Sequence, residues 1–482
     1  MTTRREFLRN AALASAGLAF SGLSSKANAV NAASTSSAAS YNRIMGSGKK
    51  VNVAFVGIGN RGWDIIREFD NTGMANVVAL CDVDLDAKHT QQALSKYPKA
   101  KRFKDFREMF DKMGNEIEAV AVSTPDFSHF PACMLAMSLN KHVFVEKPMA
   151  RTFHEVQLMM DAAKKHKNVV TQMGNQGHSE ANYFQFKAWK EAGIIKDVTA
   201  ITAHMNNARR WHTWDPNIKK LPAVEPIPKT LDWDAWLSAK EYFDYNSLYH
   251  YGDWRCWYEF GMGAMGDWGA HIIDTAHRFL ELGLPEEITP LRLDGHNDFF
   301  FPMASTVQFK FPKRGNMPPV ELTWYDGVDN IPPLPEGYGE SELDPNIPPS
   351  PAGEIEPVKL NPGKEIYSKN LTFKGASHGS TLSIIPDEKA RDMANKLPEY
   401  PKSTSNHYAN FLLACQGKEE ARSPFEIAGP LSQVFCLGVM AQRLNTKITF
   451  DRDTKRVTND AFADAFLVGH PPRKGWEEFY KI

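Results

Sequence analysis

Residues 51–62 read Val51-Asn52-Val53-Ala54-Phe55-Val56-Gly57-Ile58-Gly59-Asn60-Arg61-Gly62, an apolar run that passes directly into a glycine-rich turn. A second apolar run begins at residue 77 and ends in Asp82, twenty residues after the last glycine. This order predicts a strand, a tight turn, the start of a helix, and an acidic residue at the end of the next strand. A dinucleotide requires these features: the first glycine makes the turn, the second admits the pyrophosphate, and the third lets the helix pack on the sheet.

The same motif predicts which cofactor binds. The N-terminus of the helix carries partial positive charge and faces the phosphates. Asp82 is placed to accept hydrogen bonds from the adenosine ribose and to repel a 2′-phosphate, so we predict NAD rather than NADP. The cofactor-binding residues predicted from this motif are Gly57, Gly59, Asn60, Arg61, Gly62 and Asp82.

Length and composition are those of an ordinary globular enzyme. The chain has 482 residues, enough for about two or three domains, and a formal net charge of −1. With so little net charge, we expect no electrostatic attraction to nucleic acid or to an anionic membrane. The five cysteines are far apart and lack a Cys-x-x-Cys pair. This spacing predicts buried thiols and no metal site. If the protein is exported, two of the cysteines could instead form a disulfide.

The first 29 residues have the features of an export signal. Arg4 and Arg5 precede an apolar stretch at 11–23, and Ala27-Asn28-Ala29 fits a small-x-small cleavage pattern. The stretch is too short to span a bilayer stably, so no stable membrane anchor is expected. The paired arginines resemble a twin-arginine signal, which predicts the twin-arginine export machinery as a partner and a periplasmic location. A cytoplasmic N-terminal helix is the alternative.

Export has a consequence for the cofactor. The twin-arginine route carries folded proteins, and free NAD should be scarce outside the cytoplasm. We therefore expect the chain to fold around NAD and to release it very slowly. Residues 30–48 are rich in Ser, Ala and Asn and are predicted to be a flexible leader.

Residues 49–170 are predicted to form a Rossmann domain. Strand-like runs alternate with helical segments there, as in a doubly wound parallel sheet with helices on both faces. The expected strands are 51–56, 77–81, 118–123 and 142–145, and the expected helices include 131–140 and 153–166.

The pattern changes after residue 170. Longer, partly alternating runs predict an α+β substrate-binding domain over 171–403 with a large, open and mainly antiparallel sheet, one face of which would suit a homo-oligomer. These runs are 198–206, 290–296, 304–310 and 319–325. Residues 331–362 hold nine of the 30 prolines and predict a long surface loop. Residues 404–482 are predicted to be largely helical, over 405–417 and 424–443, and to pack back on the core.

Several motifs together resemble those of the Gfo/Idh/MocA oxidoreductases. They include the glycine turn, Cys81-Asp82-Val83-Asp84, Ser123-Thr124-Pro125-Asp126-Phe127-Ser128-His129, Val145-Glu146-Lys147-Pro148, Leu231-Asp232-Trp233-Asp234-Ala235-Trp236-Leu237 and Gly266-Asp267-Trp268-Gly269-Ala270-His271-Ile272-Ile273-Asp274. The resemblance covers most of the chain after residue 48. It implies an enzyme that oxidises or reduces a carbon bearing a hydroxyl or keto group, usually on a sugar or cyclitol.

The resemblance also implies a place for Lys147, beside the nicotinamide and bonded to the reacting hydroxyl. An ammonium there stabilises the alkoxide that develops as hydride leaves carbon. Glu146 is expected to orient Lys147 or to bond the cofactor ribose. Thr124, Pro125 and His129 follow a strand that ends at the carboxyl edge of the sheet, where ligands bind, and are predicted to line the cofactor. For His129, a packing role at the start of a helix is the alternative.

Asp267 and His271 are four residues apart, which places them on one face of a helix. Histidine has a pKa suited to accepting a hydroxyl proton near neutrality. Asp267 is expected to orient that ring or to bind a second substrate hydroxyl, with Asp274 as further support. The resemblance implies that the pair reaches the substrate opposite Lys147. A pair on a helix surface with packing roles is the alternative.

Candidates for the substrate pocket combine aromatic faces, which stack on sugar C–H groups, with side chains that bond hydroxyls. They are Gln176, His178, Arg209, Trp211, His212 and Arg255. Trp233 and Trp236 are assigned to core packing instead.

The sequence as a whole predicts an NAD-dependent oxidoreductase with tightly bound cofactor, acting on a hydroxyl or keto carbon of a sugar, polyol or glycoside. The catalytic residues would be Lys147, His271 and Asp267. The alternative is a redox-neutral glycoside hydrolase that oxidises a ring hydroxyl, eliminates the glycosidic group, adds water and returns the hydride. That cycle needs a further base and acid, for which the candidates are His204, His212, Tyr249 and Tyr251. A binding protein without activity is disfavoured because Lys147, Asp267 and His271 are intact.

Overall fold

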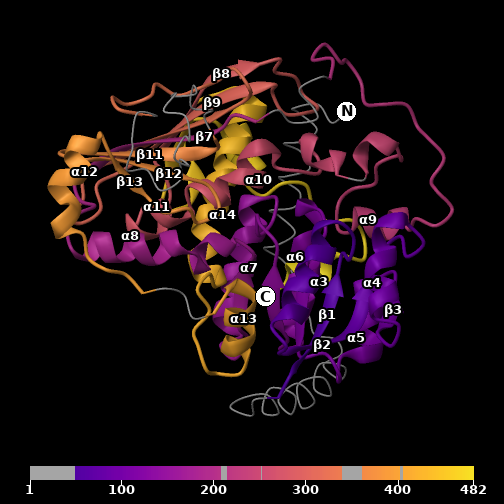
Figure 1. Ribbon diagram of the computed structural model, residues 1–482. Helices are drawn as coiled ribbons and strands as arrows, with labels where there is room; N and C mark the ends of the chain where they lie inside the picture. The colour runs from indigo at the N-terminus through magenta and orange to yellow at the C-terminus, as the bar shows by residue number, and fades with distance from the viewer. Residues whose placement is uncertain (1–48, 208–213, 251, 339–360, 402–404) are drawn as a thin grey trace, which may run out of the picture.

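The computed structural model describes residues 49–207, 214–250, 252–338, 361–401 and 405–482. These residues form two lobes, each built on one sheet (Figure 1). The predicted export signal and leader, at 1–48, lie outside the described residues.

The first lobe is a six-stranded parallel sheet in the order β3-β2-β1-β4-β5-β6, which confirms the predicted doubly wound fold. Its strands are β1 (Val51–Val56), β2 (Ala75–Cys81), β3 (Lys101–Phe103), β4 (Ala119–Val122), β5 (His142–Val145) and β6 (Thr171–Met173). Every residue of β4 and β5 is buried, because helices cover both faces of the sheet. This burial explains why these strands read as short apolar runs.

Helices of the first lobe connect the strands. They are α3 (Arg61–Asn71), α4 (Gln91–Lys96), α5 (Phe106–Met113), α6 (His129–Ser138) and α7 (Phe153–Lys165). Capping residues fix where two of them begin: Asp105 accepts a bond from the Arg107 backbone N–H, and Thr152 and Glu155 form a capping box. A helix from near the C-terminus, α13 (His407–Cys415), completes the lobe by packing Tyr408 and Phe411 on Phe69.

The second lobe is a nine-stranded sheet in the order β13-β12-β11-β7-β10-β9-β8-β14-β15. Strands β7 and β10 run parallel and their neighbours run antiparallel, which confirms the predicted open, mainly antiparallel sheet. The strands are β7 (Val198–Met205), β8 (Glu287–Asp294), β9 (Ala304–Phe311), β10 (Val320–Asp326), β11 (Gly363–Ser368), β12 (Thr372–Ala376), β13 (Ser383–Ile385), β14 (Ile448–Asp451) and β15 (Arg456–Val457). Of the predicted proline-rich loop, 339–360 lies outside the described residues, and the described ends contain no helix or strand.

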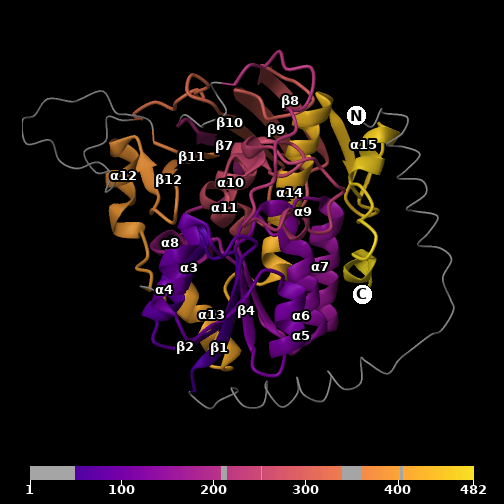
Figure 2. The same cartoon turned by 90° about the vertical axis from the view of Figure 1, so that its right-hand side faces the viewer.

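The helices of the second lobe are α8 (Ala181–Glu191), α9 (Trp233–Leu237), α10 (Gly263–Ile272), α11 (Asp274–Phe279), α12 (Asp387–Met393), α14 (Phe425–Leu444) and α15 (Ala461–Phe466). The long helix α14 lies between the lobes, against α7 and the second sheet (Figure 2). Gly269 lets α10 approach α14 closely, since a Cβ there would lie 2.6 Å from the Phe435 ring. This contact fixes the helix that carries Asp267 and His271.

All five cysteines are buried, as predicted, and none of them is joined in a disulfide. Within the described residues, no group of three or more His, Cys, Asp or Glu side chains is placed to hold a metal ion. Across the same part of the chain, no helix combines the length and apolar character needed to cross a membrane.

Candidate active site

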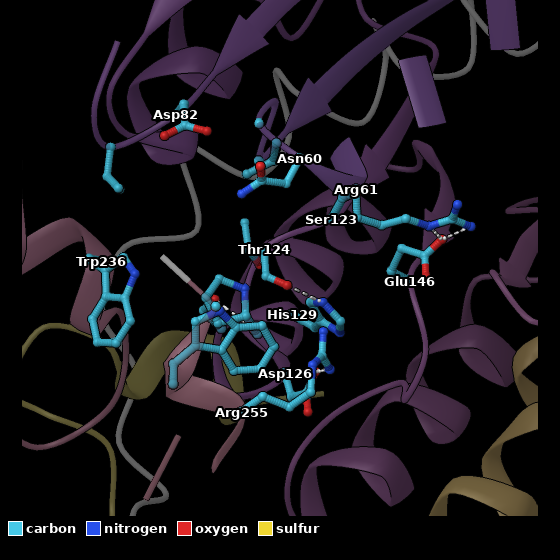
Figure 3. Close-up of a pocket in the computed structure, with 18 of the residues that line it drawn as sticks. Asn60, Arg61, Asp82, Ser123, Thr124, Asp126, His129, Glu146, Trp236 and Arg255 are labelled. Atoms are coloured by element: carbon cyan, nitrogen blue, oxygen red, sulfur yellow. Dashed lines mark hydrogen bonds and ion pairs between the residues drawn. The ribbon is translucent and has the colours of Figure 1, made fainter. Parts of the chain in front are cut away.

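One cavity of about 650 Å³ runs along the carboxyl edge of the first sheet and reaches α10 of the second lobe. Figure 3 shows part of its lining, including Asp82, Thr124 and Glu146. It is lined by residues that follow β3, β2, β1, β4 and β5, and by Asp267, Trp268 and His271 of α10. The strand order reverses between β1 and β4, so the cavity lies at the switch point where ligands bind in doubly wound sheets.

Two of the three glycines of the turn, Gly57 and Gly62, are required by close contacts with backbone atoms. Gly57 has φ +80°, and a Cβ there would lie 2.6 Å from the Ser123 carbonyl oxygen. A Cβ at Gly62 would lie 2.0 Å from the Gly57 carbonyl oxygen, so the third glycine closes the turn on itself. Beside Gly59 the space is filled by the ring of His89, 1.9 Å from where a Cβ would be. His89 lines the cavity and was not anticipated from the sequence.

Asp82 is held at the end of β2 by backbone groups. Its Oδ2 accepts a hydrogen bond from the Ile58 N–H at 3.0 Å, and its Oδ1 accepts one from Asp84 at 3.1 Å. Burial raises the pKa of Asp82, and these two bonds oppose that effect. The carboxylate is fixed between the glycine turn and the cavity, as binding of a ribose hydroxyl requires.

Polar atoms without protein partners also line the cavity. Within the described residues, the buried Thr124 Oγ1, Asp126 Oδ2, Gln176 Oε1 and His271 Nδ1 have no hydrogen-bond partner. Buried polar atoms are nearly always satisfied, so these four atoms mark places where a ligand or water bonds. Together with the glycine turn and Asp82, they fit NAD. The residues that follow β2 and β3 would hold its adenosine, and those that follow β4 and β5 or lie on α10 would face its nicotinamide.

Arg61 and Glu146 form a pair on one side of the cavity (Figure 3). The Arg61 Nε and Nη2 atoms lie 3.1 and 3.0 Å from Glu146 Oε1, and Nη2 also donates to the Tyr408 hydroxyl at 3.2 Å. Helix α13 supplies Tyr408, so residues far apart in sequence set the position of Arg61. Both predicted cofactor residues line the cavity.

His129 joins two loops of the cavity wall. Its Nδ1 lies 2.9 Å from the Pro148 carbonyl oxygen and its Nε2 lies 2.7 Å from that of Thr124. Both ring nitrogens of His129 therefore contact backbone carbonyl oxygens of the protein. This geometry favours the packing alternative over direct cofactor binding, although the residue lines the cavity beside Thr124 and Pro125.

Lys147 and Asp267 meet at the end of the cavity formed by β5 and α10. The Lys147 ammonium lies 2.6 Å from the Asp267 carbonyl oxygen and 2.9 Å from its Oδ1. Arg255 lies 3.5 Å from the same Oδ1 and 3.4 Å from Asp126. Burial raises the pKa of Asp126, and Arg255 opposes the rise. Asp267 thus orients the ammonium of Lys147, a partner not considered in the sequence prediction.

His271 lines the same end of the cavity and is stacked against a second histidine. Its ring centroid lies 4.1 Å from that of His378, with 18° between the planes. Burial, then the ammonium of Lys147 and the His378 ring, hold the pKa of His271 well below its ordinary value. His378 was missed because Ser377-His378-Gly379-Ser380 reads only as a turn and belongs to no recognised motif.

The other substrate candidates are placed differently. Gln176 and Arg255 line the cavity, whereas His178 is buried, bonds the Arg422 carbonyl oxygen and faces Asp274 at 3.7 Å. Asp274 therefore supports His178 rather than His271. His204 is fully buried against Glu365, and Tyr249 is also buried. Arg209, Trp211, His212 and Tyr251 lie outside the described residues.

A covering segment, residues 228–250, lies over the β2 and β3 side of the cavity. Lys104 donates to the Thr230 carbonyl oxygen at 2.7 Å, and the Asp232 N–H donates to Val83 at 2.9 Å. The Thr230 hydroxyl also donates to Asp84 at 3.1 Å. Within the segment, α9 places Trp236 in the cavity wall. Trp236 is buried against Trp233 as predicted, and one part of it faces the cavity.

Two domain models match this architecture. Residues 51–174 match the oxidoreductase family with an NAD-binding Rossmann fold, and 186–294 match the C-terminal alpha/beta domain of that family, Gfo/Idh/MocA. Inositol 2-dehydrogenase from Salmonella typhimurium is 29% identical over 195 residues, covering 40% of this chain and 56% of that protein. Alpha-N-acetylgalactosaminidase from Shewanella oneidensis is 28% identical over 273 residues, covering 50% of this chain and 57% of that protein. The chain thus spans little more than half of either relative.

A solved structure shows the same fold over more of the chain. The WlbA dehydrogenase from Bordetella pertussis, in complex with NADH and UDP-GlcNAcA, is 14% identical with a TM-score of 0.54. The match covers 84% of this chain and 99% of that one. This likeness shows the shared fold. Residues 51–174 match the NAD-binding Rossmann domain of the Gfo/Idh/MocA oxidoreductase family, and residues 186–294 match its C-terminal domain.

Proposed function

We propose that the protein is an NAD-dependent oxidoreductase acting on a hydroxyl or keto carbon of a sugar, polyol or glycoside. One observation carries the proposal: Lys147 and His271 line the same end of a cavity whose other end is built for a dinucleotide. Had the two side chains opened onto separate surfaces, they would not be able to act on one carbinol. The names of the inositol dehydrogenase and galactosaminidase relatives support a sugar-like substrate.

NAD, when bound, supplies the acceptor for the hydride of the carbinol carbon. Side chains of the protein stabilise the charge on the substrate oxygen and accept the hydroxyl proton. Lys147, held by Asp267, stabilises negative charge on the substrate oxygen. His271 is uncharged near neutrality because its pKa is lowered, so a ring nitrogen is free of a proton and can accept the one from the hydroxyl. The lowered pKa also makes His271 a weaker base than the histidine near neutrality that the sequence predicts. Arg255 and Gln176 line the same cavity, and we infer that they bond further hydroxyls of the substrate.

Tight retention of NAD is the second part of the proposal. The covering segment bonds the chain at Val83, Asp84 and Lys104, all beside the predicted adenosine end. A cofactor lying beneath this segment leaves slowly, because its exit requires these contacts to break. A retained cofactor suits the proposed export through the twin-arginine pathway to the periplasm.

A redox-neutral glycoside hydrolase is the second candidate. It is favoured by the second imidazole, His378, since an elimination cycle needs more than one group that handles protons. The similarity to an alpha-N-acetylgalactosaminidase also supports a glycoside hydrolase.

The test uses mature protein purified without added cofactor. Bound nucleotide is released by denaturation and identified as NAD or NADP by chromatography. The holoenzyme is then offered myo-inositol, other polyols and sugars, and 4-nitrophenyl N-acetyl-α-D-galactosaminide. Reduced cofactor that accumulates until an acceptor is added supports the oxidoreductase; nitrophenol without net reduction supports the hydrolase. Absence of bound nucleotide would contradict the tight retention of the cofactor. Recovery of NADP would contradict the role of Asp82.

A further inference from the structure

A hairpin of the second sheet reaches into the active site. Strands β12 and β13 are joined by residues 377–382, and His378 in this connection lines the cavity. Two backbone bonds hold the hairpin in place: the His378 N–H donates to the His271 carbonyl oxygen, and the Asn182 N–H donates to Gly379, both at 2.9 Å. His378 has φ +54°, a left-handed conformation that non-glycine residues adopt uncommonly. Such a conformation persists only when its surroundings impose it.

The contact between His378 and His271 is one of rings. The two imidazoles are nearly parallel, with ring centroids 4.1 Å apart. The Trp268 ring is close to perpendicular to both, with its centroid 5.1 Å from that of His378 and 6.2 Å from that of His271. The Ser377 hydroxyl lies 2.9 Å from His378 Nδ1. His271 is buried and His378 is exposed, so the outer ring covers the inner one.

We propose that His378 is a positioning residue for His271: it fixes the plane of that ring and restricts the stacked pair to a single proton. The inference rests on the proposed function, in which His271 accepts a proton. Oxidation of an alcohol by NAD breaks one C–H and one O–H bond, and for each hydride transferred one proton leaves the oxygen. That proton forms an N–H bond on His271, and the neighbouring imidazole stays neutral.

The restriction to one proton follows from the charges around the pair. Lys147 from the end of β5 and Arg61 from α3 are positive, and Asp267 from α10 is negative. A second imidazolium 4 Å from the first would add like-charge repulsion in a site that is largely buried. Partial loss of hydration and then Lys147 lower the pKa of His378 as well, in agreement with a neutral outer ring.

Two variants separate the ring from its charge. His378→Asn keeps a residue type that tolerates the left-handed backbone but removes the ring, and His378→Phe keeps a ring that cannot be protonated. His296→Asn is the control, because His296 bonds the Arg443 carbonyl oxygen and does not line the cavity. The measurement is a pH titration of the histidine signals in full-length, NAD-loaded protein by NMR, with the His271 signal assigned from His271→Asn.

The expected result is that His271 becomes protonated at higher pH in His378→Phe than in the parent, and at still higher pH in His378→Asn. Both variants lack a second imidazole that can carry positive charge, which raises the pKa of His271. His378→Asn also exposes the His271 ring to water, which raises that pKa further. Identical titration of His271 in the parent and both variants would overturn the inference. So would a His271 that stays neutral over the whole folded pH range in all three proteins.

Kinetics with an oxidised substrate from the panel gives the second readout. In His378→Asn, kcat/KM at pH 6 should fall by up to about fourfold relative to the parent, because a return to the ordinary histidine pKa leaves only about a quarter of the His271 rings neutral at that pH. At pH 8 the change should be less than about 1.5-fold, because nearly all of the rings are then neutral. An equal loss at both pH values would indicate a merely structural role and overturn the inference. If no substrate reduces the cofactor, the proposed function fails, while the NMR titration still decides the coupling of the two rings.

Discussion

At the scale of single residues, the contact between Lys147 and Asp267 has the largest consequence for chemistry. The ammonium donates to both the side chain and the backbone of Asp267, so its position is fixed before substrate arrives. A preorganised charge stabilises a transition state without reorganisation at the moment of reaction.

Replacement of Lys147 by Ala should therefore lower kcat/KM by about 10²-fold or more, because the developing alkoxide loses its nearest cation. Lys101→Ala, at an exposed lysine of β3, is the matched control and should change kcat/KM by less than about twofold. Steady-state rates on the same substrate provide the comparison. A Lys147→Ala enzyme with a near-normal rate would remove this residue from the mechanism.

Individual residues also show where sequence information ends. The glycine turn and Asp82 were predictable because fixed spacing between a strand, a turn and a second strand determines their geometry. Lys147, Asp267 and His271 belong to motifs and lie together in the cavity. His378 and His89 carry no such spacing, and only the tertiary fold brings them to the site. The partner of Asp267 was missed for the same reason, since it lies 120 residues away.

At the scale of elements, the covering segment predicts how fast NAD leaves. Lys104→Met together with Thr230→Val removes two of its polar contacts near the adenosine end. Each hydrogen bond contributes roughly 1 kcal/mol, so the release rate should rise by about tenfold or more. Release is measured by chasing bound NAD with labelled NAD. Lys101→Met serves as the control, and an unchanged rate in the double variant would contradict the role of the segment.

The packing of α10 on α14 gives a second prediction at this scale. Gly269→Ala would drive a methyl group into the Phe435 ring and should lower the free energy of unfolding by about 1–3 kcal/mol. The displaced α10 should also reduce activity, since it carries Asp267 and His271. Adding Phe435→Leu makes room and should restore part of both properties. Urea unfolding and kcat/KM measure the two effects, and a stable, fully active Gly269→Ala protein would refute the dependence on this contact.

Elements differ in how well their sequence predicts them. Four strands of the first sheet, β1, β2, β4 and β5, were predicted within a few residues because each is a largely apolar run. The three-residue strands β3 and β6 were not predicted, and two of the three residues of β3 are exposed. The strands β11, β12 and β13 were not predicted, since they are short and follow a proline-rich stretch. Their place in the sheet depends on the pairing of β11 with β7, which lies more than 150 residues earlier in the chain; β12 then pairs with β11, and β13 with β12.

At the scale of the whole molecule, buried histidines predict the response to acid. Burial lowers the pKa of His142 and His277 to about 4 and that of His407 to about 3. In the folded protein these histidines are neutral, whereas in the unfolded chain they become protonated below their ordinary pKa of about 6.5. Their contribution to the free energy of unfolding is therefore complete above about pH 6.5 and is lost as the pH falls toward 4. Each contributes a slope of about 1.4 kcal/mol per pH unit in that range.

Urea unfolding of the holoprotein at pH 7, 6 and 5 measures this dependence. We expect the free energy of unfolding to decrease at each step. Equal stability at pH 7 and pH 5 would contradict the assignment of these histidines as neutral in the fold.

Helix α13 joins the last part of the chain to the first sheet. Its Tyr408 bonds Arg61 beside the glycine turn, and Gln416 just beyond it bonds the Lys49 carbonyl oxygen where the described chain begins. Tyr408 lies 347 residues after Arg61 in the chain, so the ribosome must synthesise all of that length before the contacts around the glycine turn are complete. Loading of the coenzyme is accordingly a late event, and a prematurely terminated product would expose Phe69 and Phe144 to water instead of trapping a ligand.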